Sequence, residues 1–458
     1  MLFTLLDAGD MILRELILFA AVGFLFLGVS DLGVDLLYLA LRLKRFVLGG
    51  GPQSAATPPT AMQPGRIAVF IPAWDESEVI APMLDHAQRA FGDSDYRLYV
   101  GCYPNDPATI AAVRSAAGPK VRLVVTPSPG PTTKADCLNA MWSRMRADER
   151  DERVRFKAVV LHDAEDVVHA DELGLFDALI EQFDLVQLPV LPLVDQRSRW
   201  IAGHYIDEFA EAHGKEMVVR EALGASIPAA GVGCAISRRV LDALSRRYGL
   251  PFDPGSLTED YELGLRLRAA GYPAAFVRLP GGTGRAVVAT REYFPGTIHA
   301  AVTQKARWMA GIALAGWDRL GWEGGPAEFW MRLRDRQSVF AALLLFTGYL
   351  ALILGPALAL AGWSVGRPAE PFSRPMLVLL ATNSVLLLWR LAMRFAFVAA
   401  AYGWREGFRA LPRTVTGNII AMMAARRAAG NYLTMVRTGR PTAWDKTAHA
   451  FPGPGQGE

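Results

Sequence analysis

Three carboxylates within four positions are the feature of this sequence most suited to chemistry. Asp163, Glu165 and Asp166 follow a short apolar run, residues 158–161, which predicts a buried strand. Open α/β sheets bind their ligands at the carboxyl ends of such strands. Carboxylate oxygens on a short loop suit Mg²⁺ or Mn²⁺, and such an ion can hold the diphosphate of a nucleotide-activated donor. The alternative, a solvated acidic turn, fits these residues alone equally well.

Two histidines, His162 and His169, flank the acids. A zinc site is conceivable, but the H-E-x-x-H spacing of a helical zinc site is absent. We therefore expect the two imidazoles to form hydrogen bonds around the acid loop.

Further polar motifs follow predicted strands or open predicted helices. Residues 71–76 (Ile-Pro-Ala-Trp-Asp-Glu) close the first strand, where they could hold a base or a ribose, and Asn105 and Asp106 follow the second strand. Residues 133–139 open a helix, whose amino end suits a phosphate, and Lys134 adds a positive charge there.

Two more motifs lie further along the chain. Residues 258–262 (Thr-Glu-Asp-Tyr-Glu) start a helix, and the alternative to a catalytic role is that Thr258 caps this helix while the acids suit its first turn. Gln304-Lys-Ala-Arg307-Trp308 lies on a helical stretch before a tryptophan-rich segment. The alternative for its tryptophan is an aromatic anchor near a membrane surface.

The composition is unusual for a purely soluble enzyme. The 458 residues allow two or three domains, 52% of them are hydrophobic, and the mean hydropathy is positive. The net charge of +3 is too weak to argue for a nucleic-acid partner. The three cysteines form no C-x-x-C pair, so we expect buried thiols in a reducing compartment rather than a zinc site or a disulfide framework.

Three apolar segments predict membrane spans: about 16–41, 339–363 and 376–402. The second carries no charge and is long enough to cross a hydrocarbon core about 30 Å thick, which disfavours a soluble protein with buried core helices. The first has its basic flank on the wrong side for a signal peptide. Because positive flanks stay in the cytoplasm, we expect the N-terminus outside, residues 42–338 and the C-terminus inside, and an outer loop near 364–375.

Charged residues inside these spans need partners. Asp31 and Asp35 share one helix face, and so do Arg390 and Arg394. The hypothesis is that Asp31 pairs with Arg390 and Asp35 with Arg394. The alternatives are that these groups line a polar channel, or that the acids lie nearer the interface.

The middle of the chain predicts a mostly parallel α/β sheet flanked by helices. Strands are expected at 67–71, 98–102, 121–125, 158–161 and 185–188, and helices near 77–91, 107–117, 134–146 and 171–182. The first strand–helix turn lacks Gly-x-Gly-x-x-Gly, which argues against a nicotinamide-binding enzyme. Later in the chain, residues 414–432 predict an amphipathic helix, either on the inner membrane face or packed against the catalytic domain.

The expected organisation therefore has five parts. These are an N-terminal transmembrane span (1–48), a Gly/Pro/Ser/Thr-rich linker (49–65), a cytoplasmic α/β domain (66–330), two transmembrane helices (331–404), and an amphipathic helix with a C-terminal tail (405–458).

In this order the motifs resemble the family 2 glycosyltransferases of the GT-A fold, specifically the membrane-bound polysaccharide synthases. Those enzymes carry a D-x-D-type metal motif, a T/E-E-D motif whose last acid is the general base, and a Q-x-x-R-W motif. Here the matching residues are 163–166, 258–260 and 304–308. The sequence is most similar to the NfrB-type phage-adsorption glycosyltransferases. The residues that carry this closer similarity are 71–74, 162–169, 291–295 and 444–447.

Two departures from the family pattern matter. The metal motif reads Asp-Ala-Glu-Asp, which leaves open whether Glu165 or Asp166 accompanies Asp163. The subfamily often carries a C-terminal cyclic-di-GMP-binding region, which this sequence lacks, so control by that nucleotide would need a separate subunit.

The resemblance implies an inverting hexosyl- or N-acetylhexosaminyltransferase with a nucleotide-diphosphate sugar donor, a UDP-sugar in the simplest case. Asp260 would be the catalytic base, and Mg²⁺ or Mn²⁺ would be held by Asp163 with Glu165 or Asp166. Donor and acceptor would be bound by Pro72, Ala73, Trp74, Glu76, Asp106, Lys134, Asn139, Glu259, Gln304, Arg307 and Trp308.

The expected setting is the bacterial inner membrane, where the multi-pass chain would contact lipid and extend an exopolysaccharide from its cytoplasmic domain. The acceptor would be a glycan or a lipid-linked sugar. Three spans are few for an export channel, so a homo-oligomer or an outer-membrane partner could complete the path. The alternatives are single addition to a lipid carrier, and a degenerate transferase that serves as a scaffold or phage-adsorption subunit.

Overall fold

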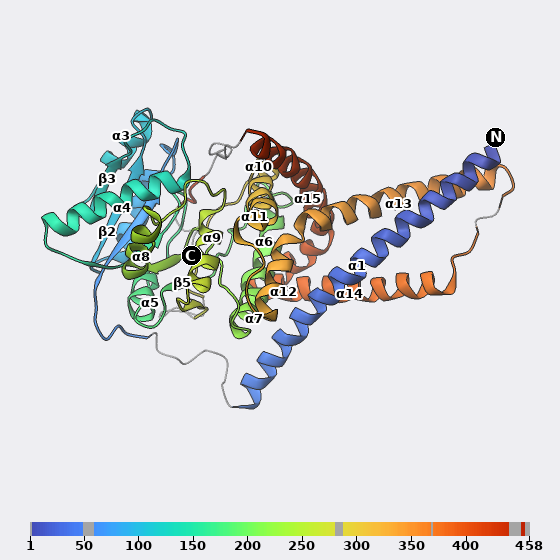
Figure 1. Ribbon diagram of the computed structural model, residues 1–458, viewed down its shortest axis with the longest axis horizontal. Helices are drawn as coiled ribbons and strands as arrows, with labels where there is room; N and C mark the ends of the chain where they lie inside the picture. The colour runs from blue at the N-terminus through green and yellow to red at the C-terminus, as the bar shows by residue number, and fades with distance from the viewer. Residues whose placement is uncertain (1, 49–58, 280–286, 368–369, 439–449, 454–458) are drawn as a thin grey trace.

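The computed structural model describes residues 2–48, 59–279, 287–367, 370–438 and 450–453. An α/β domain lies at one end of the molecule, and three long helices extend away from it at the other (Figure 1). The first part of the expected linker and the 444–447 motif lie outside the described residues.

A seven-stranded sheet forms the centre of the α/β domain, in the order β3-β2-β1-β4-β6-β5-β7. Strands β1 to β4 pair in parallel, β5 pairs in parallel with β7, and β6 runs antiparallel between β4 and β5. The strands are β1 (Arg66–Pro72), β2 (Tyr96–Cys102), β3 (Val121–Val125), β4 (Phe156–Leu161), β5 (Leu185–Gln187), β6 (Cys234–Ser237) and β7 (Ala274–Phe276). The five expected strands and the mostly parallel sheet are confirmed, and β6 and β7 are additional.

Both faces of the sheet are covered, because successive residues of a strand point to opposite sides. Ile67, Val69 and Ile71 of β1 join one buried cluster, and Ala68 and Phe70 join the other. The first cluster is completed by helices α2 (Ile80–Phe91), α3 (Pro107–Ser115) and α5 (Glu172–Leu179). The second is completed by α4 (Lys134–Asp151), α8 (Arg238–Tyr248) and α9 (Glu259–Ala269). The three cysteines are buried free thiols, as expected.

Three helices of the described chain are long and apolar enough to cross a membrane. They are α1 (Leu2–Val47), α13 (Ser338–Ser364) and α14 (Arg374–Tyr402), which confirms the three expected segments. Their apolar side chains are largely exposed, as in Leu352 and Leu388, because lipid rather than protein would cover them. The identity of the membrane and the direction of each crossing stay predictions.

A layer of helices, all short except the 35-residue α15, joins the α/β domain to the three candidate membrane helices (Figure 1). Its members are α6 (Gly203–Glu211), the π-helix η1 (Ala212–Glu216), α7 (Met217–Ala222), α10 (Ile298–Trp308), the π-helix η2 (Met309–Ala315), α11 (Gly316–Leu320), α12 (Pro326–Arg336) and α15 (Trp404–Thr438). Ile420 and Ala424 of α15 are buried in a cluster with α10, while Phe408 and Ile419 are exposed. The expected amphipathic helix therefore packs one face against α10 and its neighbours in this layer.

One of the two expected ion pairs inside the spans is confirmed. Asp31 pairs with Arg390, and it also binds Arg334 of α12 at 2.9 Å. The pairing of Asp35 with Arg394 is wrong, because two residues of the neighbouring layer intervene.

Lys215 of η1 and Glu211 of α6 are those intervening residues. Lys215 binds Asp35 at 2.5 Å and Glu211 at 3.1 Å, and Glu211 binds Arg394 at 2.6 Å. The indole of Trp389 also donates to Asp35 at 2.9 Å. Asp35, Lys215, Glu211 and Arg394 therefore form a row of ion pairs that alternate in sign. This row joins α1 and α14 to the layer beside the α/β domain.

Candidate active site

Lys134 lies between the acid loop and the start of α9. It is the first residue of α4, whose amino end is closed by a capping box between Thr133 and Asp136. Its ammonium binds the Asp163 carboxylate at 2.6 Å and also interacts electrostatically with Glu259 and Asp260. The lysine of one predicted motif and the acids of two others therefore meet at one point.

Asp260 is held at the start of α9. One of its oxygens accepts the N–H of Tyr261 at 2.7 Å, as suits an acid in the first turn of a helix. The other faces Gly231, where an added Cβ would lie 2.3 Å from it. Asp260 is therefore fixed against a backbone that leaves no space for a side chain.

Thr258 does not cap α9, so that alternative is wrong. It occupies the cap position, but its hydroxyl makes no capping bond, and no partner for it is present among the described residues. Its side chain instead faces Gly311 of η2, where a Cβ would approach it to 2.6 Å. Ser256 closes this turn by accepting the N–H of Thr258 at 3.2 Å and donating to Glu262 at 2.7 Å.

Burial and like charges govern the protonation of this cluster. Burial, reinforced by Asp260, raises the pKa of Glu259 to about 7. Burial also raises the pKa of Asp260, although Lys134 and Arg307 oppose the shift. Burial alone would lower the pKa of Lys134, but Asp163 and the two α9 acids outweigh it and raise that pKa above its usual range. A carboxylate with a raised pKa is better matched to proton transfer near neutral pH.

A buried histidine, His162, binds the acid loop from the side of the protein core. His162 is fully buried, and its two ring nitrogens lie 2.7 Å from Asp166 and 2.7 Å from Glu172. Burial would lower the pKa of His162, but these two carboxylates outweigh it and raise the pKa to about 10, so both nitrogens donate. Asp166 in turn accepts the N–H of Asp163 at 3.0 Å. The expected hydrogen-bonding role for this histidine is confirmed.

The other histidine also binds within the loop. The backbone N–H of His169 donates to Glu172 at 3.2 Å, and its ring accepts the N–H of Asp171 at 3.1 Å. Within the described residues no three or more His, Cys, Asp or Glu side chains converge as a metal cage. A zinc site, which takes three or four protein ligands, therefore does not suit the described part of the loop.

The acid loop does suit a divalent ion that is shared with a phosphate ligand. Mg²⁺ is usually held by one or two carboxylates and substrate phosphates, and Asp163 already binds a cation in the Lys134 ammonium. One oxygen of Asp166 is hydrogen-bonded to His162, and the other is buried without a partner among the described residues. Glu165 is buried in the same turn, so both acids stay candidates for the second ligand beside Asp163.

A glycine loop before β6 was not recognised from the sequence. Gly231 and Gly233 have φ of +77° and +56°, which disfavours other residues, and a Cβ on Gly233 would lie 2.2 Å from Thr290. The buried side chain of Gln187 holds this loop, since its nitrogen donates to the Val232 carbonyl at 2.9 Å and its oxygen accepts the N–H of Ala230 at 2.8 Å. The detectable signal was a Gly-x-Gly pair directly before an apolar run.

The loop after β1 lies beside the end of β2. The N–H groups of Asp75 and Thr109 both donate to Asp106, at 2.6 and 3.2 Å, so this acid caps α3 and fixes the turn. The N–H of Glu76 donates to the Thr109 hydroxyl at 2.9 Å. Pro72 ends β1, Ala73 donates to the Gly101 carbonyl at 2.8 Å, and the Trp74 ring packs edge-on against Tyr103. The predicted base- or ribose-binding residues therefore form one rigid corner.

Asn139 lies deeper than its predicted ligand-binding role suggests. Its amide donates to the Phe252 carbonyl at 2.8 Å and accepts the Phe252 N–H at 3.2 Å. Both of its polar atoms are thus engaged in joining α4 to the segment before α9.

Helix α10 carries Gln304, Arg307 and Trp308 next to this cluster. Arg307 lies close enough to Glu259 and Asp260 to oppose their pKa shifts, and it has no carboxylate partner of its own in the described part of the chain. The Gln304 oxygen is buried and likewise unpaired there. Trp308 packs edge-on against rings that include Tyr205, so it lies in an aromatic cluster rather than at a lipid surface.

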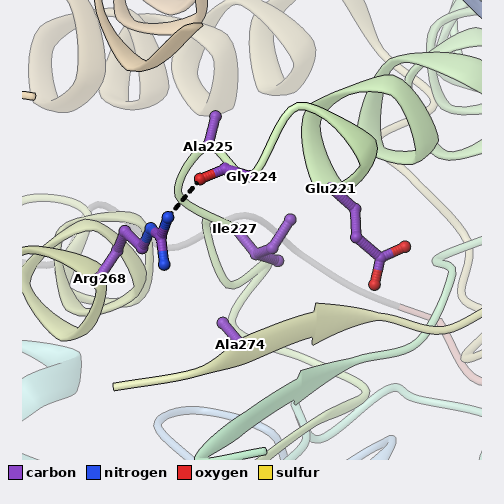
Figure 2. A pocket seen from close by; sticks show the side chains of 6 residues that line it. All are labelled: Glu221, Gly224, Ala225, Ile227, Arg268 and Ala274. Carbon is purple, nitrogen blue, oxygen red and sulfur yellow. Dashed lines mark hydrogen bonds between the residues drawn. The ribbon is translucent and has the colours of Figure 1, made fainter. Parts of the chain in front are cut away.

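One described cavity lies elsewhere. It measures about 50 Å³ and is lined by Glu221, Gly224, Ala225, Ile227, Arg268 and Ala274 (Figure 2). Arg268 closes it by donating to the Gly224 carbonyl at 2.7 Å, and Glu221 accepts the Phe276 N–H at 3.2 Å. None of the predicted site residues lines it.

Comparisons with known proteins place the chain among sugar transferases. The family model described as Glycosyltransferase like family 2 matches residues 64–311. Bacteriophage adsorption protein B of Escherichia coli (strain K12) and bacteriophage N4 adsorption protein B of Escherichia coli O157:H7 are each 36% identical over an alignment of 453 residues that covers 93% of this chain. The chain spans 60% of the length of these relatives.

A solved structure shares the fold. The mannosyltransferase PcManGT from Pyrobaculum calidifontis, in complex with GDP-Man and Mn²⁺, matches with a TM-score of 0.50 and 19% sequence identity, covering 93% of this chain and 100% of that one. The fold is therefore GT-A-like, as expected.

We predict that His162→Leu destabilises the protein by roughly 3–5 kcal/mol, because Asp166 and Glu172 would be left buried without their common cation. Thermal unfolding of the full chain in detergent would show a lowered melting temperature. His169→Leu is the matched control: its ring accepts one backbone N–H at a part-exposed position, so we expect a loss below about 1 kcal/mol. Equal melting temperatures for the two variants would contradict the role given to His162.

Proposed function

Because the chain belongs to glycosyltransferase-like family 2, we propose that it transfers a sugar from a nucleotide-diphosphate donor to a growing exopolysaccharide at the bacterial inner membrane, with inversion. One observation carries the proposal: Lys134 binds Asp163 and interacts electrostatically with Asp260, so residues of three motifs lie together. The three candidate membrane helices support a membrane setting.

The donor would bind along the carboxyl ends of β1, β2 and β4. The corner formed by residues 72–76 and Asp106 would face the base and ribose. Asp163, with Glu165 or Asp166, would hold Mg²⁺ or Mn²⁺, which when bound neutralises the diphosphate as it leaves. Lys134 and Arg307 would supply further positive charge to the phosphates.

Asp260 would act as the general base. Its carboxylate takes the proton from an acceptor hydroxyl while that oxygen attacks the anomeric carbon and the bond to the diphosphate oxygen breaks. One base and no carboxylate nucleophile give direct displacement, which inverts the anomeric configuration. Through its unpaired oxygen Gln304 would accept a hydrogen bond from a hydroxyl of the acceptor end, or through its amide N–H it would donate to the leaving diphosphate. Trp308 would contact an acceptor sugar. Glu259, with its raised pKa, would stay beside the base as a second acid.

The names of the two Escherichia coli relatives favour a second candidate function, that of a phage-adsorption subunit. Such a subunit could make a surface glycan, or it could be a scaffold without catalysis. Single addition to a lipid carrier is a third form of the same chemistry. Sugar transfer by the native chain, compared with transfer by the Asp260→Asn variant, distinguishes a scaffold from an active transferase.

We predict that membranes containing the chain transfer sugar from at least one donor in a panel of UDP-sugars and GDP-mannose with Mn²⁺ or Mg²⁺. Asp260→Asn should slow this transfer by about 10²–10⁴-fold, because the acceptor proton then has no base. Radiolabelled product would be measured and sized, since a ladder or polymer indicates repeated addition and a single lipid-soluble product indicates a lipid carrier.

The control is donor binding, which Asp260→Asn should leave close to that of the native chain. Full transfer by the variant would refute the base assignment. No transfer by the native chain with any donor would instead favour the scaffold.

We predict that Gly231→Ala lowers transfer roughly 10²-fold, because a Cβ would lie 2.3 Å from the Asp260 carboxylate and displace it. Gly271→Ala is the matched control: Gly271 also has positive φ, at +82°, but nothing lies within 4 Å of an added Cβ. Both variants therefore carry similar backbone strain, about 1–2 kcal/mol, and only the first moves the base. Equal activities in the transfer assay would contradict the placement of Asp260.

A further inference from the structure

Arg278 and Arg291 of the α/β domain lie close to the C-terminal ends of α1 and α14. Arg278 follows β7, and its guanidinium donates to the His213 carbonyl of η1 at 3.3 Å. Arg42, near the end of α1, is close enough to repel the Arg278 charge. Arg291 lies on the segment whose backbone pairs with Val167, directly after the acid loop. The three cations thus come from three separate parts of the chain.

These arginines lack acidic partners within the part of the chain that the structure describes. In the described residues none of Arg42, Arg278 and Arg291 forms an ion pair. Burial lowers the pKa of Arg278, Arg42 lowers it further, and only the phenols Tyr38 and Tyr402 oppose the shift. A partly buried guanidinium in this state is stabilised by any anion that reaches it.

Tyr402 supplies a hydrogen-bond donor to the same place. Its hydroxyl is buried and has no hydrogen-bond partner in the described part of the chain, although Arg291, Asp207 and Arg278 interact with it electrostatically. Asp207 is not free to pair with the two cations, because Arg413 binds both of its oxygens, at 3.0 and 2.7 Å.

The position suits a lipid rather than a soluble anion. Tyr38 of α1 packs edge-on against Phe397 of α14 at 5.2 Å, so the two candidate spans are in contact beside the cluster. Tyrosines concentrate where membrane helices meet water, and basic pockets between such helices bind lipid headgroups. Arginine also matches the geometry of phosphate oxygens better than lysine does.

We propose that Arg278, Arg291 and Tyr402, with Arg42 at the edge, bind the phosphate of a lipid whose chains lie along α1 and α14. The phosphate would lie near the acid loop, because the backbone of Arg291 pairs with that of Val167, the residue that follows the loop. The site is separate from the donor site, and it does not require that the chain be catalytically active.

Native mass spectrometry of the full chain in detergent tests the site, with phosphatidylglycerol, a polyprenyl monophosphate, diacylglycerol and inorganic phosphate as separate probes. We expect one saturable site for a phosphate-bearing lipid, and weaker binding by about tenfold or more in the Arg278→Gln/Arg291→Gln double variant. Tyr402→Phe should weaken binding less, because it removes one hydroxyl. Arg278→Lys keeps the charge but loses the guanidinium geometry, so it should bind more weakly than the native chain and more tightly than the glutamine variant, which guards against misfolding of the latter.

Arg405→Gln is the matched control, since Arg405 is an exposed arginine three residues after Tyr402 and should not affect binding. Tighter binding of the polyprenyl monophosphate would identify a lipid-linked acceptor, and equal or tighter binding of phosphatidylglycerol would identify a bilayer lipid. The proposal is refuted if diacylglycerol binds equally well, if inorganic phosphate binds and the lipids do not, or if the double variant binds like the native chain. Because the readout is binding, its failure would leave the transferase proposal standing.

Discussion

The ion pair between Lys134 and Asp163 is the contact on which the site depends. It joins the start of α4 to the loop after β4, and the same ammonium stabilises the two acids that open α9. Buried carboxylates that lie together cannot all stay ionised without a nearby cation. Lys134 therefore allows three acids from two separate segments to approach one another, in the arrangement that we propose for a ligand that brings its own cation and diphosphate.

Two supporting layers hold this cluster in position. Behind the acid loop, His162 is bound by Asp166 and Glu172, so the turn that presents Asp163 is fixed from the core. Beneath α9, Gln187 holds the glycine loop against which Asp260 rests. On the membrane side, ion pairs connect α1 and α14 to α6, and Glu208 of α6 binds Lys305 of α10 at 2.5 Å. The helix that carries Arg307 is thereby linked to the candidate spans.

Much of the fold was predictable from the sequence, because the local residue pattern of many elements matches the structure that they form. The apolar runs of β1 to β5, the three long helices and the order of the motifs follow from periodicity and composition. The strands β6 (Cys-Ala-Ile-Ser) and β7 (Ala-Ala-Phe) are about as short as β5, but both contain alanine, which is depleted in strands, so their sequences do not indicate one. The alternative that Thr258 caps α9 was plausible from the sequence, but the Thr258 side chain packs against η2 instead. The partner of Asp35 could not be foreseen, because Lys215 comes from a π-helix in a different part of the chain.

The central claim is that Asp163 and its neighbours form a metal-dependent site for a nucleotide diphosphate. The most direct test is calorimetric titration of UDP and GDP into the full chain, with and without Mn²⁺, and into Asp163→Asn. The account predicts that at least one nucleotide binds only when Mn²⁺ is present, and that Asp163→Asn abolishes this binding while the protein stays folded. Equal binding to the native chain and to Asp163→Asn, or binding that is indifferent to Mn²⁺, would contradict it.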